Sequence, residues 1–168
     1  MYKSTKSVLL FSVFIFMMGS SLKSYAQTPD LVGKTSAKEV REQHRIFDIY
    51  TKRYEPNSES LKYLSEIQDS VSIYVLFGTW CHDSKKQIPA FMKTMELADN
   101  SNIEVEYFAV SRKKKEPIDI IERWDLKLTP TFIIYKNGTE YGRIVEEPRL
   151  SLEQDLVLIL KSETISDQ

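Results

Sequence analysis

The sequence predicts an α/β fold, in which a central mixed β-sheet is flanked by helices and preceded by an N-terminal helical extension. The chain has 168 residues, 42% hydrophobic and 28% charged, as expected for one globular domain. Strand-like apolar runs alternate with segments of helical periodicity, which favours a parallel pair of strands joined through a helix. A Lys-Asn-Gly turn at 136–138 then predicts an antiparallel hairpin.

The elements are expected in a simple order along the chain. Residues 27–35 are polar and are predicted to be a flexible lead-in, and 36–54 shows the apolar spacing of a helix that begins with a capping box. Further helices are predicted at 61–67, 81–97, 118–124 and 151–160, and strands at 71–77, 103–110, 131–135 and 141–145. These boundaries divide the chain into residues 1–26, an extension at 27–57 and a main domain at 58–168.

The first 26 residues have the three-part layout of a secretory signal peptide. Lys3 and Lys6 precede an eleven-residue apolar run at 8–18, and small residues lead up to a cut after Ala26. The run is too short to span a bilayer, which takes about 20 apolar residues. We therefore expect an exported protein, periplasmic or extracellular, that contacts a membrane only through an uncleaved signal peptide.

Charge and residue spacing exclude several functions. Residues 27–168 carry 20 basic and 24 acidic side chains, a net charge of −4, which gives no general affinity for nucleic acid. The basic run Arg112 to Lys115 is interpreted as a solvated loop. No cofactor is predicted, because no glycine loop suited to phosphate is present. Two histidines and one cysteine give no metal-ligand spacing, so no metal is predicted either.

Cys81 is the single cysteine of the chain, so no internal disulfide can form. An odd cysteine in an exported protein is a buried small hydrophobe, an intermolecular partner or a reactive thiol. Cys81 falls where a strand has ended and a helix begins, and free N–H groups at a helix start stabilise a thiolate. His82 and Asp83 are expected to tune the acidity of this thiol in opposite directions, and Ser84 to donate a hydrogen bond to the sulfur.

Two motifs carry a family resemblance. "WCHDSK" at 80–85, with Pro89 following, resembles the W-C-x-x-C-K active site and kinked helix of the thioredoxin-like superfamily. "LTPTFIIYKNGTEYGRIVE" at 128–146 resembles the cis-proline loop, strand and last hairpin of the same superfamily. The two motifs occur in the right order with the right elements between them, so the resemblance covers roughly residues 61–160.

The resemblance implies a role for each matching residue. Cys81 corresponds to the nucleophile that attacks a substrate disulfide, and Trp80 to the aromatic residue beside it. Pro130 corresponds to the cis-proline that places the backbone of Thr129 next to the nucleophile. The implied partners are extended segments of protein thiols or disulfides, which these residues would hold.

Two positions depart from the family pattern. Ser84 stands where the resolving cysteine belongs, so release of a mixed disulfide needs an external thiol. Val75 stands where the family often has a buried acid. The resulting hypothesis is an exported thiol–disulfide oxidoreductase of monothiol type, with Cys81 and Ser84 at its catalytic site. The alternatives are a thioredoxin-fold binding or chaperone-like module that has lost turnover, and a sensor that oxidises at Cys81.

Overall fold

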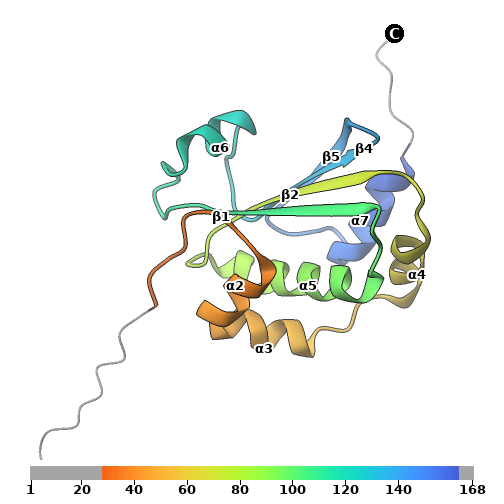
Figure 1. Ribbon diagram of the computed structural model, residues 1–168, viewed down its shortest axis with the longest axis horizontal. Coiled ribbons are helices and arrows are strands. Elements are labelled where there is room, and N and C mark those ends of the chain that lie inside the picture. The colour runs from red at the N-terminus through yellow and green to blue at the C-terminus, as the bar shows by residue number, and fades with distance from the viewer. Residues whose placement is uncertain (1–27, 163–168) are drawn as a thin grey trace, which may run out of the picture.

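Five strands form one mixed sheet in the order β1-β3-β2-β4-β5. The structure is a computed structural model, and it describes residues 28–162. The strands are β1 (Gly33–Thr35), β2 (Val71–Phe77), β3 (Ile103–Ala109), β4 (Thr131–Lys136) and β5 (Thr139–Val145). Central β2 runs parallel to β3 and antiparallel to β4, which confirms the predicted mixed sheet (Figure 1).

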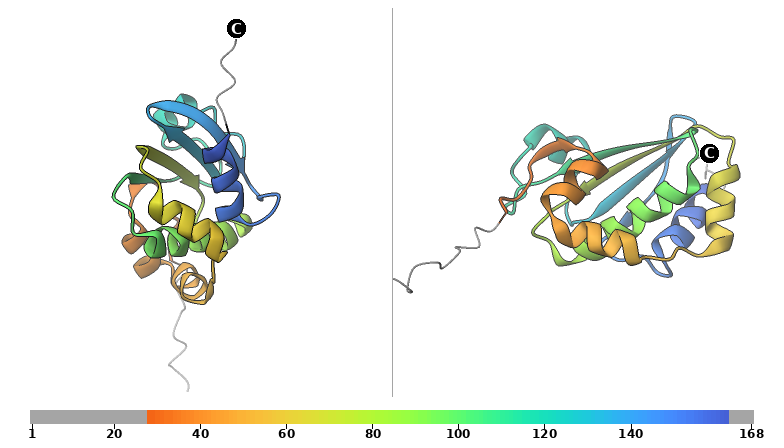
Figure 2. Two further views of the ribbon diagram at one scale, coloured as in Figure 1. Left: turned by 90° about the vertical axis from the view of Figure 1, so that its right-hand side faces the viewer. Right: turned by 60° about the horizontal axis from the view of Figure 1, so that its bottom comes forward.

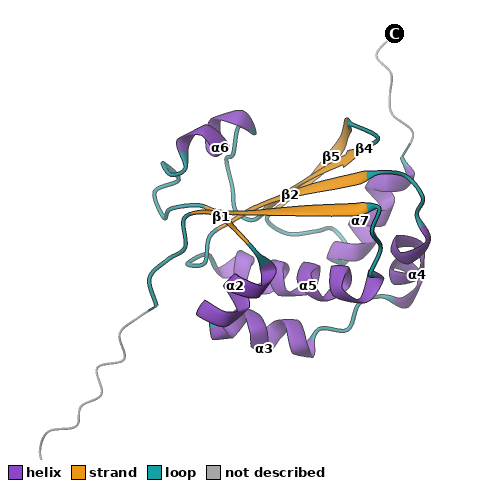
Figure 3. Ribbon diagram, viewed as in Figure 1, coloured by secondary structure: helices purple, strands orange, loops and turns teal. Residues whose placement is uncertain are grey.

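The helices are distributed unequally over the two faces of the sheet. They are α2 (Ala37–Gln43), α3 (Arg45–Arg53), α4 (Ser58–Glu66), α5 (His82–Ala98), α6 (Ile118–Arg123) and α7 (Leu152–Lys161). Of these, α6 lies on one face, and the other helices gather on the opposite face (Figures 2 and 3). The longest helix, α5, is in contact with α3, α4 and α7.

The larger hydrophobic core lies on the face of the sheet opposite α6, and it holds α5 in place. Ile73, Val75 and Phe77 of β2 point into this core, which also contains Phe91 of α5. The ring of Phe91 lies 5.2 Å from that of Phe132 in β4, measured between centroids. Burial of one such side chain contributes roughly 1.5–3 kcal/mol to stability. The helix that follows Cys81 is therefore fixed firmly against the sheet.

The smaller core lies on the face that α6 covers. Leu76 and Ile133 point to this side, and Trp124 packs on Tyr74 with ring centroids 4.7 Å apart. Trp124 is 3% exposed, whereas Ile118, at the start of α6, is 54% exposed.

Two predictions for the N-terminal region are wrong. The expected flexible lead-in ends in β1, which pairs antiparallel with β3 through Gly33 and Ala109. The expected single helix at 36–54 is broken at His44, whose φ and ψ of −120° and 85° are not helical. Val40 and Phe47, on either side of the break, are both buried in the core with α5.

The predicted signal peptide, residues 1–26, lies outside the part of the chain that the structure describes. Between residues 28 and 162, no helix combines the length and apolar character needed to cross a membrane.

Candidate functional site

Cys81 lies at the junction that the sequence predicted, between the end of β2 and the start of α5. It is the N-cap residue of α5, and its carbonyl accepts from the Lys85 N–H at 3.2 Å. Its own N–H donates to the Gly78 carbonyl at 3.0 Å and closes a tight turn. A Cβ atom at Gly78 would lie 2.5 Å from the Trp80 ring, so this turn requires glycine.

The loop before β4 contacts Cys81, although Thr129 follows Cys81 by 48 positions in the sequence. The Cys81 thiol donates to the Thr129 carbonyl oxygen, with Sγ and oxygen 3.0 Å apart. The Thr129–Pro130 peptide bond is cis, and the Pro130 carbonyl accepts from the Glu146 N–H at 2.8 Å. Cys81 is 8% exposed and Thr129 is buried, so the sulfur is held against this loop.

Ser84 is fully buried one turn into α5, but it does not contact the sulfur as expected. Its hydroxyl oxygen accepts a hydrogen bond from the Gly78 N–H at 3.2 Å. The Cys81 thiol bonds to the Thr129 carbonyl instead. The predicted hydrogen bond from Ser84 to Cys81 is therefore not formed within residues 28–162. Ser84 stabilises the turn between β2 and α5, since it supplies the acceptor for a buried N–H.

Trp80 is fixed from two directions. Its indole Nε1 donates to the Val110 carbonyl at 3.0 Å. The guanidinium of Arg112 lies 5.6 Å from the ring centroid and pairs with Asp30 at 3.1 Å. Asp30 also accepts from the Thr79 hydroxyl at 3.4 Å. The start of the described chain thus holds an arginine over the aromatic residue that precedes Cys81.

Sequence reasoning missed this contact of Asp30 and Arg112. Arg112 was interpreted as part of a solvated loop and Asp30 as part of a flexible lead-in. The two residues are 82 positions apart, and no periodic pattern links them. The antiparallel pairing of β1 with β3 brings them together, and a strand of three residues gives little signal in a sequence.

Three further predicted positions have distinct environments. His82 is exposed and Asp83 is half-buried, and their tuning of the thiol stays a prediction. Val75 is fully buried on β2, in register with Tyr107 on one side and Phe132 on the other. Burial raises the pKa of the Tyr107 phenol, so Tyr107 stays neutral. Beneath the cysteine the core therefore offers no carboxylate from β2.

No metal centre accompanies the cysteine in the described part of the chain. Residues 28–162 contain no group of three or more histidine, cysteine or acidic side chains arranged to hold an ion. The chemistry available at the site comes from a thiol at a helix start, a backbone carbonyl and an aromatic side chain.

Comparison with known proteins identifies the family to which this fold belongs. A family model described as thioredoxin matches residues 32–156. The chain therefore belongs to the thioredoxin family, a class of thiol–disulfide redox proteins. The matched range includes β1, α2 and α3, so these elements lie within the region of family similarity.

Individual relatives agree with this assignment. The chain is 32% identical over 100 residues to putative thioredoxin-5 of Dictyostelium discoideum, covering 59% of this chain and 90% of that protein. It is 24% identical over 97 residues to thioredoxin AMT13 of Alternaria alternata, covering 58% and 77%. Among solved structures, an HIV epitope-scaffold has a TM-score of 0.51 at 19% identity, covering 75% of this chain and 76% of that one. This last similarity concerns the fold alone.

Proposed function

We propose that this protein is an exported thiol–disulfide oxidoreductase of monothiol type. The observation that carries the proposal is the position of the Cys81 sulfur, at the start of α5 and 3.0 Å from the Thr129 carbonyl. Membership of the thioredoxin family supports redox chemistry at this thiol. A serine at position 84, together with a single cysteine in the chain, restricts that chemistry to one thiol.

The reaction proceeds through a mixed disulfide. The Cys81 thiol loses its proton to solvent, and the thiolate attacks one sulfur of a substrate disulfide. A new S–S bond joins Cys81 to the substrate, and the other substrate sulfur leaves as a thiolate that takes up a proton. A second thiol, from the substrate or from a small-molecule thiol, then attacks the mixed disulfide and returns Cys81 to its reduced form.

The surroundings of Cys81 position the substrate for this attack. The backbone of Thr129 lies beside the sulfur, so an extended chain along this loop brings its own sulfur close to Cys81. Trp80 borders the same position and is held by Arg112. Pro130 fixes the direction in which the loop enters β4. Catalysis here is largely positioning, which converts a bimolecular step into an effectively intramolecular one.

Export follows from the predicted signal peptide at residues 1–26. In an oxidising compartment disulfides persist, so proteins carrying them are available as partners. The substrates are extended segments of extracytoplasmic proteins, and the resolving thiol comes from outside the chain.

A second candidate is a thioredoxin-fold binding module without turnover. The buried hydrogen bond from Gly78 to Ser84 favours it, because Ser84 serves the local structure rather than the sulfur. Val75 also stands where the family often has a buried acid, so β2 contributes no carboxylate to the core. In this case Cys81 would contribute nothing to the interaction with unfolded chains.

One experiment separates the two functions. The protein and its Cys81→Ala variant are incubated with a scrambled-disulfide substrate and glutathione, and recovery of native substrate is measured. We expect recovery with the wild type and a loss to the uncatalysed rate with the variant. Equal suppression of aggregation by both proteins, without recovery of native substrate, would establish the binding module instead.

A further inference from the structure

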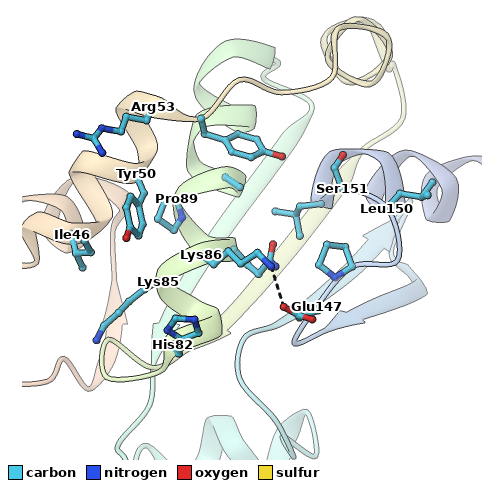
Figure 4. A pocket seen from close by; sticks show the side chains of 15 residues that line it. Ile46, Tyr50, Arg53, His82, Lys85, Lys86, Pro89, Glu147, Leu150 and Ser151 are labelled. Carbon is cyan, nitrogen blue, oxygen red and sulfur yellow. Dashed lines mark hydrogen bonds and ion pairs between the residues drawn. The ribbon is translucent and has the colours of Figure 1, made fainter.

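A groove of about 640 Å³ runs along α5. Its walls come from α3, the first half of α5 and the loop between β5 and α7. Figure 4 shows Tyr50 and Arg53 on one side, Leu150 and Ser151 on the other, and His82 at one end. We call it the α3–α5 groove. His82 follows Cys81 in the chain, so the groove begins next to the nucleophile.

Cations dominate the polar lining of the α3–α5 groove. Lys85, Lys86 and Arg53 line it together with a single carboxylate, Glu147. Glu147 is already paired with Lys86 at 3.1 Å. Between positions 28 and 162, neither Arg53 nor Lys85 forms an ion pair. The groove therefore carries excess positive charge on a protein whose residues 27–168 have a net charge of −4.

Apolar side chains lie between these cations. Tyr50 is 43% exposed and Leu150 is 63% exposed on opposite rims. Pro89 is buried in the lining and has no N–H, which leaves the Lys85 carbonyl without the helical donor that position 89 would supply. Exposed apolar rims distinguish this groove from a purely solvated cationic surface. These features together suit a peptide segment.

We infer that the α3–α5 groove binds an acidic segment of the protein substrate, with apolar residues interspersed, beside the cysteine that reacts with Cys81. The inference rests on the proposed function and specifies its substrate class. Arg53 and Lys85 pair with carboxylates of the segment, and Tyr50 and Leu150 contact its apolar side chains. Charge complementarity of this kind confers specificity and raises the rate of association.

The helix geometry limits where the acidic residues lie in the substrate. Pro89 is eight positions after Cys81, and a helix rises 1.5 Å per residue, so the α5 lining of the groove extends to about 12 Å from Cys81 along the helix axis. An extended chain covers this distance in about four residues. We therefore expect carboxylates within about four residues of the reacting cysteine of the substrate.

Peptide binding tests the inference without any thiol chemistry. The probe is a short fluorescein-labelled peptide in which glutamate alternates with leucine, and its match has glutamine in place of glutamate. We expect the glutamate peptide to bind about tenfold more tightly at low ionic strength, by fluorescence anisotropy, and the difference to shrink as salt is added. The Arg53→Glu, Lys85→Glu double variant should abolish the preference.

Lys62→Glu is the matched control, because Lys62 is exposed on α4 and lies outside the groove lining. It should leave the preference unchanged, and thermal melts verify that all variants fold. Equal binding of the two peptides, or a preference that survives in the double variant, would overturn the inference. So would sedimentation showing a dimer that the double variant dissociates, because a second copy would then occupy the groove.

The assay also distinguishes this inference from the proposed function. Neither peptide contains cysteine, so a preference for glutamate supports the groove even if Cys81 proves unreactive. Conversely, the protein could carry out Cys81-dependent exchange and yet bind the two peptides equally. That result would support the proposed function and exclude a role for the groove in it.

Discussion

Two surfaces near Cys81 are built differently. On the inner side, the thiol faces the Thr129 carbonyl, and buried Ser84 secures the turn beneath it. Both of these hydrogen bonds are buried. On the outer side, the α3–α5 groove presents the cations Arg53 and Lys85 between apolar side chains. In the functions proposed above, the inner surface performs the exchange and the outer surface selects which disulfide is presented.

The largest effect is expected on the inner surface, from Ser84→Cys. A thiol at this buried position, one helical turn from Cys81, would attack the Cys81 mixed disulfide from within the chain. Intramolecular thiols act at effective concentrations far above those of added thiols, so release should accelerate by about a hundredfold or more. The measurement is the lifetime of an isolated mixed disulfide in the absence of added thiol.

Ser84→Ala serves as the control for this variant. It removes the acceptor of the Gly78 N–H without introducing a thiol, so it should cost about 1–3 kcal/mol of stability and leave the lifetime unchanged. If Ser84→Cys also left the lifetime unchanged in a correctly folded protein, the position would not be that of a resolving cysteine.

A buried carboxylate connects the two walls of the α3–α5 groove. Glu153 of α7 is 2% exposed and accepts hydrogen bonds from the Tyr54 hydroxyl at 2.8 Å and the Asn57 N–H at 2.9 Å. The Ser151 hydroxyl donates to it at 2.6 Å. These bonds attach the end of α3 to the start of α7 and so hold the two walls of the α3–α5 groove.

Glu153→Ala should therefore destabilise the protein by about 2–4 kcal/mol, because it leaves the Tyr54 hydroxyl and the Asn57 N–H without their acceptor. Urea unfolding followed by circular dichroism measures this loss. A loss below about 0.5 kcal/mol would contradict the structural role of the carboxylate.

The same carboxylate should make stability depend on pH. Burial raises the pKa of Glu153, but its hydrogen bonds, led by that from Ser151, outweigh burial, and the pKa in the folded protein is lowered. Its stabilisation is therefore fully present above the pKa of the unfolded carboxyl and is lost as pH falls through the folded pKa. Below about pH 4 the stability of Glu153→Gln should approach that of the wild type. If the difference in unfolding free energy between the wild type and Glu153→Gln stayed constant with pH, the Glu153 carboxylate would be excluded as the source of the pH dependence.

Comparison of these regions also shows what could be predicted from the sequence. β2 and α5 were expected because an apolar strand run and a helix start flank Cys81, and the cis-proline motif indicated which loop would face it. Each of these signals is local in the sequence. The contact between Cys81 and the Thr129 loop was expected only from the resemblance to the thioredoxin-like superfamily. The walls of the groove were not foreseen, because Tyr50 and Leu150 are 100 positions apart. Each looks like an ordinary apolar residue of an amphipathic segment.

The smallest effect is expected from the contact that fixes Trp80. Asp30→Asn removes the partner of Arg112, and an exposed ion pair of this kind contributes about 0–1 kcal/mol. Global stability should change little, while the fluorescence of Trp80 should change as Arg112 leaves the ring. Trp124, buried under α6, provides a constant background. Unchanged fluorescence would show that the Val110 carbonyl alone fixes the indole.

The most direct test of the proposed function is the reaction of the native protein with a peptide carrying a chromogenic mixed disulfide. The expected result is stoichiometric release of the chromophore, formation of a peptide adduct at Cys81, and decay of that adduct at a rate proportional to added glutathione. The Cys81→Ala variant should release none. A wild-type protein that reacts only after denaturation would contradict the proposal, because Cys81 would then be a buried and inert thiol.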